Sequence, residues 1–279
     1  MRKSGHDAPD ECDGPQERPT VIDAHTHLSP ISPEGAELRA ESMIEKMNAS
    51  GVDAIISMGS GGDTFEALKR NNDFNLQSAV DYANRIIPLV YFDPRYEEDG
   101  IGEIDRCIAK GRFKGIKVGH QFAEARYMYP MMEKAQEYKL PVAIHSDHSV
   151  RNHPYIIADL ASSFPKVPVV ILHMGGRTSA AVEMVAIKAA EKNQNVWLET
   201  CFSNPYPIRI AVQRLGADRI MFGSDTSNSG FGYGSGYERE EYEMMIHMES
   251  IRCLRLPKEE EAKIMGVNAM RLFSLEVGR

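Results

Sequence analysis

The chain has 279 residues, and its 40 acidic side chains outnumber its 32 basic ones, which gives a formal net charge of −8. Such a chain is repelled by nucleic acid and by anionic membrane surfaces, so neither is an expected partner. No apolar run approaches the roughly 18 residues that span a bilayer, and no apolar stretch typical of a signal peptide begins the sequence.

The four cysteines bear on the expected location of the protein. Cys12, Cys107, Cys201 and Cys253 lie far apart, and no two of them form a CxxC pair. This distribution disfavours a disulfide framework or a zinc knuckle and is typical of a reducing compartment. We therefore expect a cytoplasmic protein.

Two regions differ in composition. Residues 1–19 are polar and rich in proline and glycine, and we expect a disordered tail there. Residues 20–279 contain no linker and are expected to form one domain, in which short β-branched runs alternate with stretches of helical spacing. The expected strands are Val21–Ala24, Ala54–Met58, Ile86–Phe92, Gly115–Val118, Val142–His145, Val169–His173, Val196–Thr200 and Ile220–Gly223. The expected helices cover 34–49, 64–83, 101–110, 128–139, 153–163, 178–191, 206–215, 237–255 and 258–274.

This alternation predicts an α/β fold, a (β/α)8 or TIM barrel. Parallel strands joined by helices must bury both faces of their sheet, and eight such units in about 260 residues match the usual size of this barrel. An open doubly wound sheet is the alternative, but it normally has a glycine-rich turn after its first strand, where this chain has His-Thr-His at 25–27. Gly51, Gly111 and Gly216 stand where helices should end.

Side chains able to bind a metal gather at the C-terminal ends of the expected strands. In a (β/α)8 barrel these ends form one mouth, where active sites lie. Residues two apart on a strand share a face, so both histidines of the His-Thr-His segment should point into the barrel. Imidazole nitrogens and a carboxylate are the usual ligands of a catalytic divalent ion. The residues that meet this description are His25, His27, His145, His173 and Asp225.

Six ordered motifs make the sequence recognisable. They are VIDAHTH (21–27), FKGIKV (113–118), PVAIHS (141–146), LHMGG (172–176), RIMFGSD (219–225) and NAMRLF (268–273). Together, over residues 20–275, they resemble the amidohydrolase superfamily of metal-dependent TIM-barrel enzymes. The branch that they resemble most is the amidohydrolase-related (amidohydrolase 2) family, which also contains aminocarboxymuconate-semialdehyde decarboxylase.

The resemblance implies one divalent metal ion, zinc in the first place and manganese or iron as alternatives. His25, His27, His145 and Asp225 match the family's metal ligands. His173 matches a histidine that hydrogen-bonds the metal-bound water or the substrate rather than a second metal. Asp225 and His173 are therefore the expected catalytic residues.

Several nearby residues have weaker or divided interpretations. In binuclear members of the superfamily a lysine at the place of Lys117 is carboxylated and bridges two metals, whereas here an ordinary amine is favoured, either binding the substrate or serving only structure. His148 and Arg151 are weaker candidates for substrate binding. Glu199 is interpreted as a pocket acid or as a partner of a histidine, and Asp23 is expected to share the face of His25. The other residues near the mouth are His120, His153, Arg177, Ser224 and the glycine-rich loop 226–236, which is either a lid or a plain loop.

Two enzymatic functions fit these residues. The favoured one is a metal-dependent hydrolase that uses an activated water on an amide, ester or lactone bond of a small molecule, because the short loops lack the large insertions expected around a decarboxylase pocket. The alternative is a metal-dependent decarboxylase of a small aromatic or muconate-like acid, with Lys117, Arg151 or Arg177 binding the carboxylate. A barrel that only binds a ligand is disfavoured by the complete ligand set. The apolar segment 244–256 leaves room for a homo-oligomer.

Overall fold

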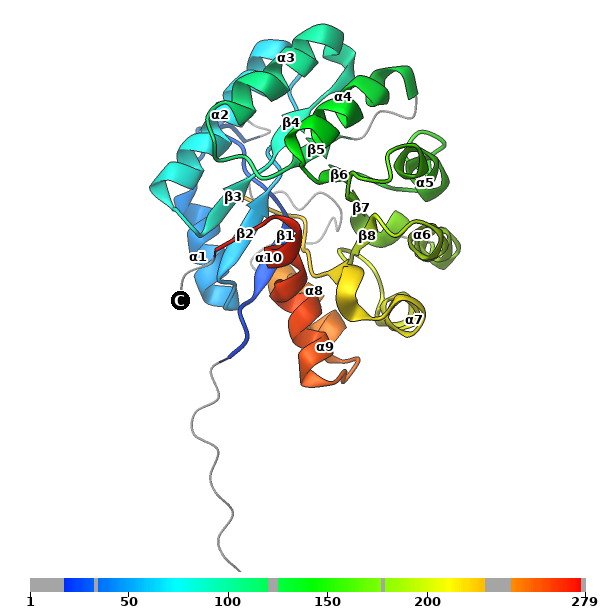
Figure 1. The fold of residues 1–279 in the computed structure, drawn as a ribbon. Helices are drawn as coiled ribbons and strands as arrows, with labels where there is room; N and C mark the ends of the chain where they lie inside the picture. Colours follow the sequence, from blue (N-terminus) through cyan, green and yellow to red (C-terminus); the bar gives the residue numbers. More distant parts are fainter. Residues whose placement is uncertain (1–17, 33–34, 120–124, 177–178, 229–241, 277–279) are drawn as a thin grey trace, which may run out of the picture.

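The computed structural model describes residues 18–32, 35–119, 125–176, 179–228 and 242–276, in which an inner ring of strands is surrounded by helices (Figure 1). No helix in these ranges combines the length and apolarity needed to cross a membrane. The strands are β1 Ile22–His27, β2 Ala54–Ser57, β3 Ile86–Pro88, β4 Val90–Phe92, β5 Ile116–Val118, β6 Val142–Ile144, β7 Val169–Ile171, β8 Val196–Glu199, β9 Ile220–Met221 and β10 Thr226–Ser227. The α-helices are α1 Glu41–Ser50, α2 Phe65–Asp81, α3 Glu97–Ile108, α4 Ala125–Tyr138, α5 Pro154–Ser163, α6 Ala180–Lys192, α7 Pro205–Leu215, α8 Glu243–Arg252, α9 Lys258–Ala262 and α10 Asn268–Leu272.

The strands form a closed parallel barrel. Their order is β10-β1-β2-β3 in one sheet and β4 to β9 in the other, and every pair is parallel. One extended segment joins the sheets, because the Leu89 N–H donates to Ser57 O at 2.8 Å and the Val90 N–H donates to Gly115 O at 2.9 Å. On the other side the Ala24 N–H donates to Phe222 O at 2.9 Å. The predicted (β/α)8 barrel is therefore confirmed, and the open doubly wound sheet is excluded.

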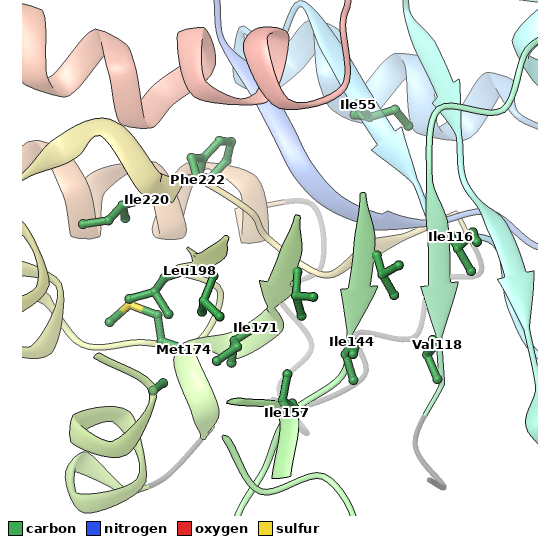
Figure 2. Packing of buried hydrophobic residues seen from close by; sticks show 14 of the residues in the cluster. Ile55, Ile116, Val118, Ile144, Ile157, Ile171, Met174, Leu198, Ile220 and Phe222 are labelled. Atoms are coloured by element: carbon green, nitrogen blue, oxygen red, sulfur yellow. The ribbon is translucent and has the colours of Figure 1, made fainter. Parts of the chain in front are cut away.

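Alternate residues along each strand build two apolar layers. One set, which includes Ile116, Ile144 and Ile171 on successive strands, packs outward against the surrounding helices (Figure 2). The other set fills the barrel interior and contains Ile22, Ala24, Ala54, Ile56, Ile87, Leu89, Ala143, Val170, Leu172 and Met221. Burial on both faces explains why the strands are near-continuous apolar runs rather than alternating ones.

The C-terminal helical segment closes the N-terminal end of the barrel. Ala269 and Phe273 belong to the interior apolar cluster. The buried Asn268 side chain donates from Nδ2 to the carbonyl oxygens of Ala217 and Ile220, both at 2.7 Å, and so fastens α10 to the start of β9. The opposite, C-terminal end of the barrel is left for the site.

The boundaries differ from prediction in three places. The expected helix 34–49 begins only at Glu41, because the chain first makes a turn in which Gly35 has a φ of 87°. The expected helix 258–274 is divided by a π-helical turn at Lys263–Val267. The last barrel strand ends at Met221 instead of Gly223, and residues of the expected loop 226–236 form β10 beside β1.

Three predicted helix-ending glycines lie within the described ranges, whereas two predicted segments fall largely outside them. Gly51, Gly111 and Gly216 have φ values of 74°, 79° and 70°, as expected just after helix ends. Residues 1–17 of the expected tail, and residues 229–236 of the expected loop, lie outside the described residues.

Two glycines provide a matched test of the packing around the C-terminal segment. At Gly266 a Cβ would overlap the carbonyl oxygen of Thr20, just before β1, whereas at Gly102 in α3 a Cβ would meet nothing within 4 Å. We expect Gly266→Ala to lower the free energy of unfolding by about 1–3 kcal/mol, since the backbone must shift. Gly102→Ala should raise it by about 0.5–1 kcal/mol through helix propensity. Urea unfolding of both variants checks this, and equal effects would contradict the described packing.

Candidate active site

A β-bulge in β1 aims the two predicted histidines into the mouth. Asp23 pairs with Ile55 and Thr26 with Ser57, so β1 has one residue more than β2 between these pairs. Ile22 and Ala24 point into the apolar interior below the bulge, and His25 and His27 face the mouth above it. Bulges beside active sites commonly redirect side chains in this way.

The bulge also corrects the prediction for Asp23. This residue lies between two inward-facing neighbours and so occupies the opposite face from His25. Its carboxylate accepts hydrogen bonds from the Ser224 hydroxyl group and from the Ser224 N–H, the latter at 3.0 Å. Burial raises the pKa of Asp23 to about 7. Asp23 therefore holds the β9–β10 connection in place and does not point into the mouth.

Three candidate ligand atoms converge at the mouth. His25 Nε2 lies 3.2 Å from His27 Nε2, and the Asp225 Oδ1 atom lies 3.2 Å and 3.0 Å from these two nitrogens. The other nitrogen of each ring is engaged: His25 Nδ1 contacts Glu199 Oε2 at 2.9 Å, and His27 Nδ1 bonds the carbonyl oxygen of Gly59. Such partners fix the tautomer and direct Nε2 toward a metal position. This donor set fits a divalent ion.

Glu199 holds the site from below. This fully buried carboxylate accepts N–H groups from His25 Nδ1 and from the backbones of His173, at 3.1 Å, and Cys201. Burial raises its pKa to about 8, while the backbone donors counter the rise. A Cβ at Gly223 would overlap the Glu199 carboxylate, so glycine is needed there for the close approach. Of the two interpretations left open by the sequence, this geometry matches the histidine partner.

The electrostatics of the cluster favour metal-binding protonation states. Burial alone would raise the pKa of Asp225, but its interactions with the His25 and His27 imidazoles, including a hydrogen bond from His27, hold that pKa well below its ordinary value. Burial lowers the pKa of His25, so its imidazole is neutral. A carboxylate and a neutral imidazole are the forms that bind a divalent ion.

The backbone adopts unusual conformations around the mouth. Nine non-glycine residues in the described ranges have positive φ, and four of these follow the ends of barrel strands: His173 at 60°, Met174 at 47°, Phe202 at 58° and Asp225 at 61°. Such conformations cost roughly 1–3 kcal/mol each and gather at functional sites, where the surrounding structure holds them.

His173 lies beside His25, with ring centroids 4.8 Å apart, and His145 lies next to His173 on its other side. His173 Nε2 is 3.1 Å from His145 Nδ1, and His145 Nε2 is 3.4 Å from Asp147 Oδ2. All the predicted ligands except His25 line one cavity of about 50 Å³, enough for an ion and a water molecule. Its lining consists of His27, Ser60, Gly61, Tyr91, Lys117, Gly119, His145, His173 and Asp225.

Lys117 is a buried cation that faces this cavity. Its side chain is 3% exposed, and no described carboxylate lies within ion-pairing distance of Nζ. Burial lowers its pKa to about 8, although Asp225 and Glu199 act in the opposite direction. Tyr91 is its register partner on the neighbouring strand, and the Tyr91 hydroxyl lies against Gly61 and Gly119. The two side chains place an ammonium and a phenol beside the metal position.

The other predicted residues that the structure describes do not line the cavity. His148 and Arg151 are exposed in the segment after β6 and do not line it. His153 precedes α5, where its Nδ1 accepts the Tyr155 N–H at 3.3 Å. His120 and Arg177 lie outside the described residues.

Sequence reasoning missed four residues close to the site. Phe202 stacks on His173 with ring centroids 5.6 Å apart, and its N–H donates to Nδ1 of the buried His247 at 3.4 Å. Cys201 lies beside His25 and His173, and Tyr91 lies beside Lys117. Only Cys201 had a readable signal, since it stands two residues after Glu199.

Replacing Lys117 should stabilise the metal-free protein. Below pH 8 the lysine is charged in both the folded and unfolded states, so the folded state carries the full cost of burying the charge. We expect Lys117→Met to raise the free energy of unfolding by about 1–3 kcal/mol at pH 7. The gain should shrink as the pH rises from 8 to 10.5, where the unfolded lysine also loses its proton. Urea unfolding at pH 7 and at pH 10 tests this prediction, and the exposed Lys110→Met serves as the control that should change little. A loss of stability in Lys117→Met at pH 7 would contradict it.

Comparisons with known proteins agree with this architecture. A family model described as Amidohydrolase matches residues 22–275. A search of curated proteins gives no match. Among solved structures, a zinc-bound amidohydrolase from Burkholderia multivorans is 16% identical, with a TM-score of 0.71 over 92% of this chain and 100% of that one.

Two further structures carry other activities. A variant 5-carboxyvanillate decarboxylase from Novosphingobium aromaticivorans, with bound manganese, is 15% identical, with a TM-score of 0.67 over 94% of this chain and 99% of that one. A 4-oxalomesaconate hydratase from Rhodopseudomonas palustris is 18% identical, with a TM-score of 0.66 over 91% and 96%. At these identities the likeness concerns the fold alone. The family match over nearly the whole barrel shows that this chain belongs to the amidohydrolase family and is an enzyme of the amidohydrolase superfamily.

Proposed function

We propose that this chain is a metal-dependent hydrolase that cleaves an amide, ester or lactone bond of a small molecule. The observation that carries the proposal is the convergence of His25 Nε2, His27 Nε2 and Asp225 Oδ1 within 3.2 Å of one another. The Glu199 carboxylate and the Gly59 carbonyl oxygen hydrogen-bond the other nitrogen of each ring and so orient both imidazoles toward the same point.

These three residues would hold one divalent ion, with His145 as a further ligand from the end of β6. A bound ion of this kind activates water and polarises a carbonyl group. Zinc and manganese are both present in relatives of the same fold. The cavity volume of about 50 Å³ suits an ion and a water molecule, so most of the substrate would lie outside this cavity.

The chain's own residues supply the remaining steps of the proposed reaction. The Asp225 carboxylate accepts a proton from the attacking water and passes it to the leaving group. His173, which lines the same cavity as Asp225, donates a hydrogen bond to the carbonyl oxygen as negative charge develops. The Lys117 ammonium and the Tyr91 hydroxyl bind an anionic or carbonyl group of the substrate.

A decarboxylase of a small aromatic or muconate-like acid is the second candidate. The buried Lys117 favours it, because an ammonium group that lines the cavity suits a substrate carboxylate. The decarboxylase of the same fold adds support. The two candidates share the metal position. The hydrolase consumes water, whereas the decarboxylase releases carbon dioxide.

A paired substrate screen separates the candidates. Metal-loaded protein is offered lactones, esters and amides with and without a carboxylate, and acid release is followed. The same protein is offered aromatic and muconate-like acids, and carbon dioxide release is followed. We expect hydrolysis that chelation abolishes and added zinc or manganese restores. Carbon dioxide release without hydrolysis would replace the first candidate with the second.

A single carboxylate-to-amide change tests the metal position. We expect Asp225→Asn to weaken metal binding and to lower turnover by about 10²–10⁴-fold, because the ligand oxygen and the proton acceptor are lost together. The matched control is Asp218→Asn, at the N-terminal end of the barrel, where Asp218 pairs with Lys263 at 3.1 Å. Elemental analysis and turnover are measured on both variants. An Asp225→Asn protein with unchanged metal content and activity would remove the basis of the proposal.

A further inference from the structure

A buried thiol stands at the edge of the proposed metal position. Cys201 is fully buried and follows Glu199, the last residue of β8, by two positions. The extended backbone continues past the strand end, since the Thr200 N–H donates to Met221 O at 3.0 Å. Cys201 then begins a turn, and its N–H donates to the Glu199 carboxylate, which also accepts hydrogen bonds from His25 and His173.

Two histidine nitrogens lie beside this thiol. The Cys201 Sγ atom and one ring nitrogen each of His25 and His173 all lie within 4.8 Å of one another. His25 also belongs to the group with His27 and Asp225. The sulfur therefore belongs to a three-residue ligand group that shares His25 with the proposed metal position, and it is not an isolated cysteine.

Ligand softness turns this placement into a metal preference. Thiolate is a soft ligand that favours zinc, cobalt and cadmium, whereas manganese and magnesium prefer oxygen ligands. We propose that Cys201 supplies a sulfur ligand to the metal centre from the His173 side and thereby makes the centre selective for a thiophilic ion, zinc rather than manganese. This inference rests on the proposed function in one respect, that an ion binds at His25. It specifies the metal, which relatives of the same fold leave open between zinc and manganese.

The chain contains matched control cysteines. Cys107 is also buried, but its thiol donates to Glu103 Oε1 at 3.3 Å within α3, on the outer layer of the barrel. Cys253 is exposed just after α8. Serine at either position removes a thiol and leaves the mouth unchanged.

Cobalt(II) substitution reports sulfur ligation directly. The full-length protein carrying Cys12→Ser is loaded with cobalt(II), so that a thiol in the N-terminal segment does not contribute. We expect a thiolate-to-cobalt charge-transfer band in the near ultraviolet. The band should persist in Cys107→Ser and Cys253→Ser and disappear in both Cys201→Ser and Cys201→Ala. Circular dichroism verifies that each variant is folded, and a band that survives both Cys201 changes would overturn the inference.

Metal competition measures the selectivity itself. Each protein is equilibrated with zinc and manganese together, and the bound ratio is determined by elemental analysis. Zinc exceeds manganese at most nitrogen and oxygen sites as well, so the informative quantity is the change in this ratio. We expect Cys201→Ser to lower the zinc-to-manganese ratio by about tenfold or more and to leave manganese binding intact. An unchanged ratio would contradict the inference.

The outcomes distinguish the two proposals. If the unaltered mouth binds an ion that Asp225→Asn releases, and no sulfur signature is present, only the role of Cys201 fails. If no ion binds at all, the proposed metal-dependent function fails together with it.

Discussion

The site depends on one buried carboxylate. Glu199 receives an N–H from His25 on β1, an N–H from His173 after β7 and an N–H from Cys201 after its own strand. A buried carboxylate is costly unless hydrogen bonds satisfy it. Moving any of these donors away would leave the carboxylate buried without a partner, and this cost keeps the three segments together. Gly223 leaves the space for this carboxylate, and the orientation of His25 follows from it. The mouth is thus organised around an acceptor that is not itself placed among the metal ligands.

Much of this arrangement could be predicted from the sequence, and the rest was hidden for physical reasons. The alternating apolar runs predict the barrel fold. The polar residues at the ends of these runs predict that His25, His27, Lys117 and Asp225 lie at its mouth. Asp23 lies on the opposite face from the one that strand periodicity predicts, because a one-residue bulge leaves no trace in a pattern of period two. The relation between Tyr91 and Lys117 depends on the register of two strands 26 residues apart along the chain, which composition does not encode.

Stability and chemistry are provided by different parts of the barrel. The interior below the mouth is filled by aliphatic side chains, and the helices cover an equally apolar outer layer. The mouth contains features that oppose stability, namely a buried lysine and left-handed backbone at His173, Phe202 and Asp225. The two apolar layers supply the excess of stability that lets these features persist.

The position of α10 has a consequence for the order in which the protein acquires its structure. Barrel closure joins β1 to the β9 segment, and Ala269 and Phe273, which complete the interior apolar cluster, follow β9 in the sequence. Contacts of such long sequence separation form late, because the connecting loop must be closed first. During synthesis the N-terminal strands leave the ribosome long before their partners exist. The interior of the nascent barrel therefore stays open to solvent until the residues of α10 have been synthesised and have packed against it.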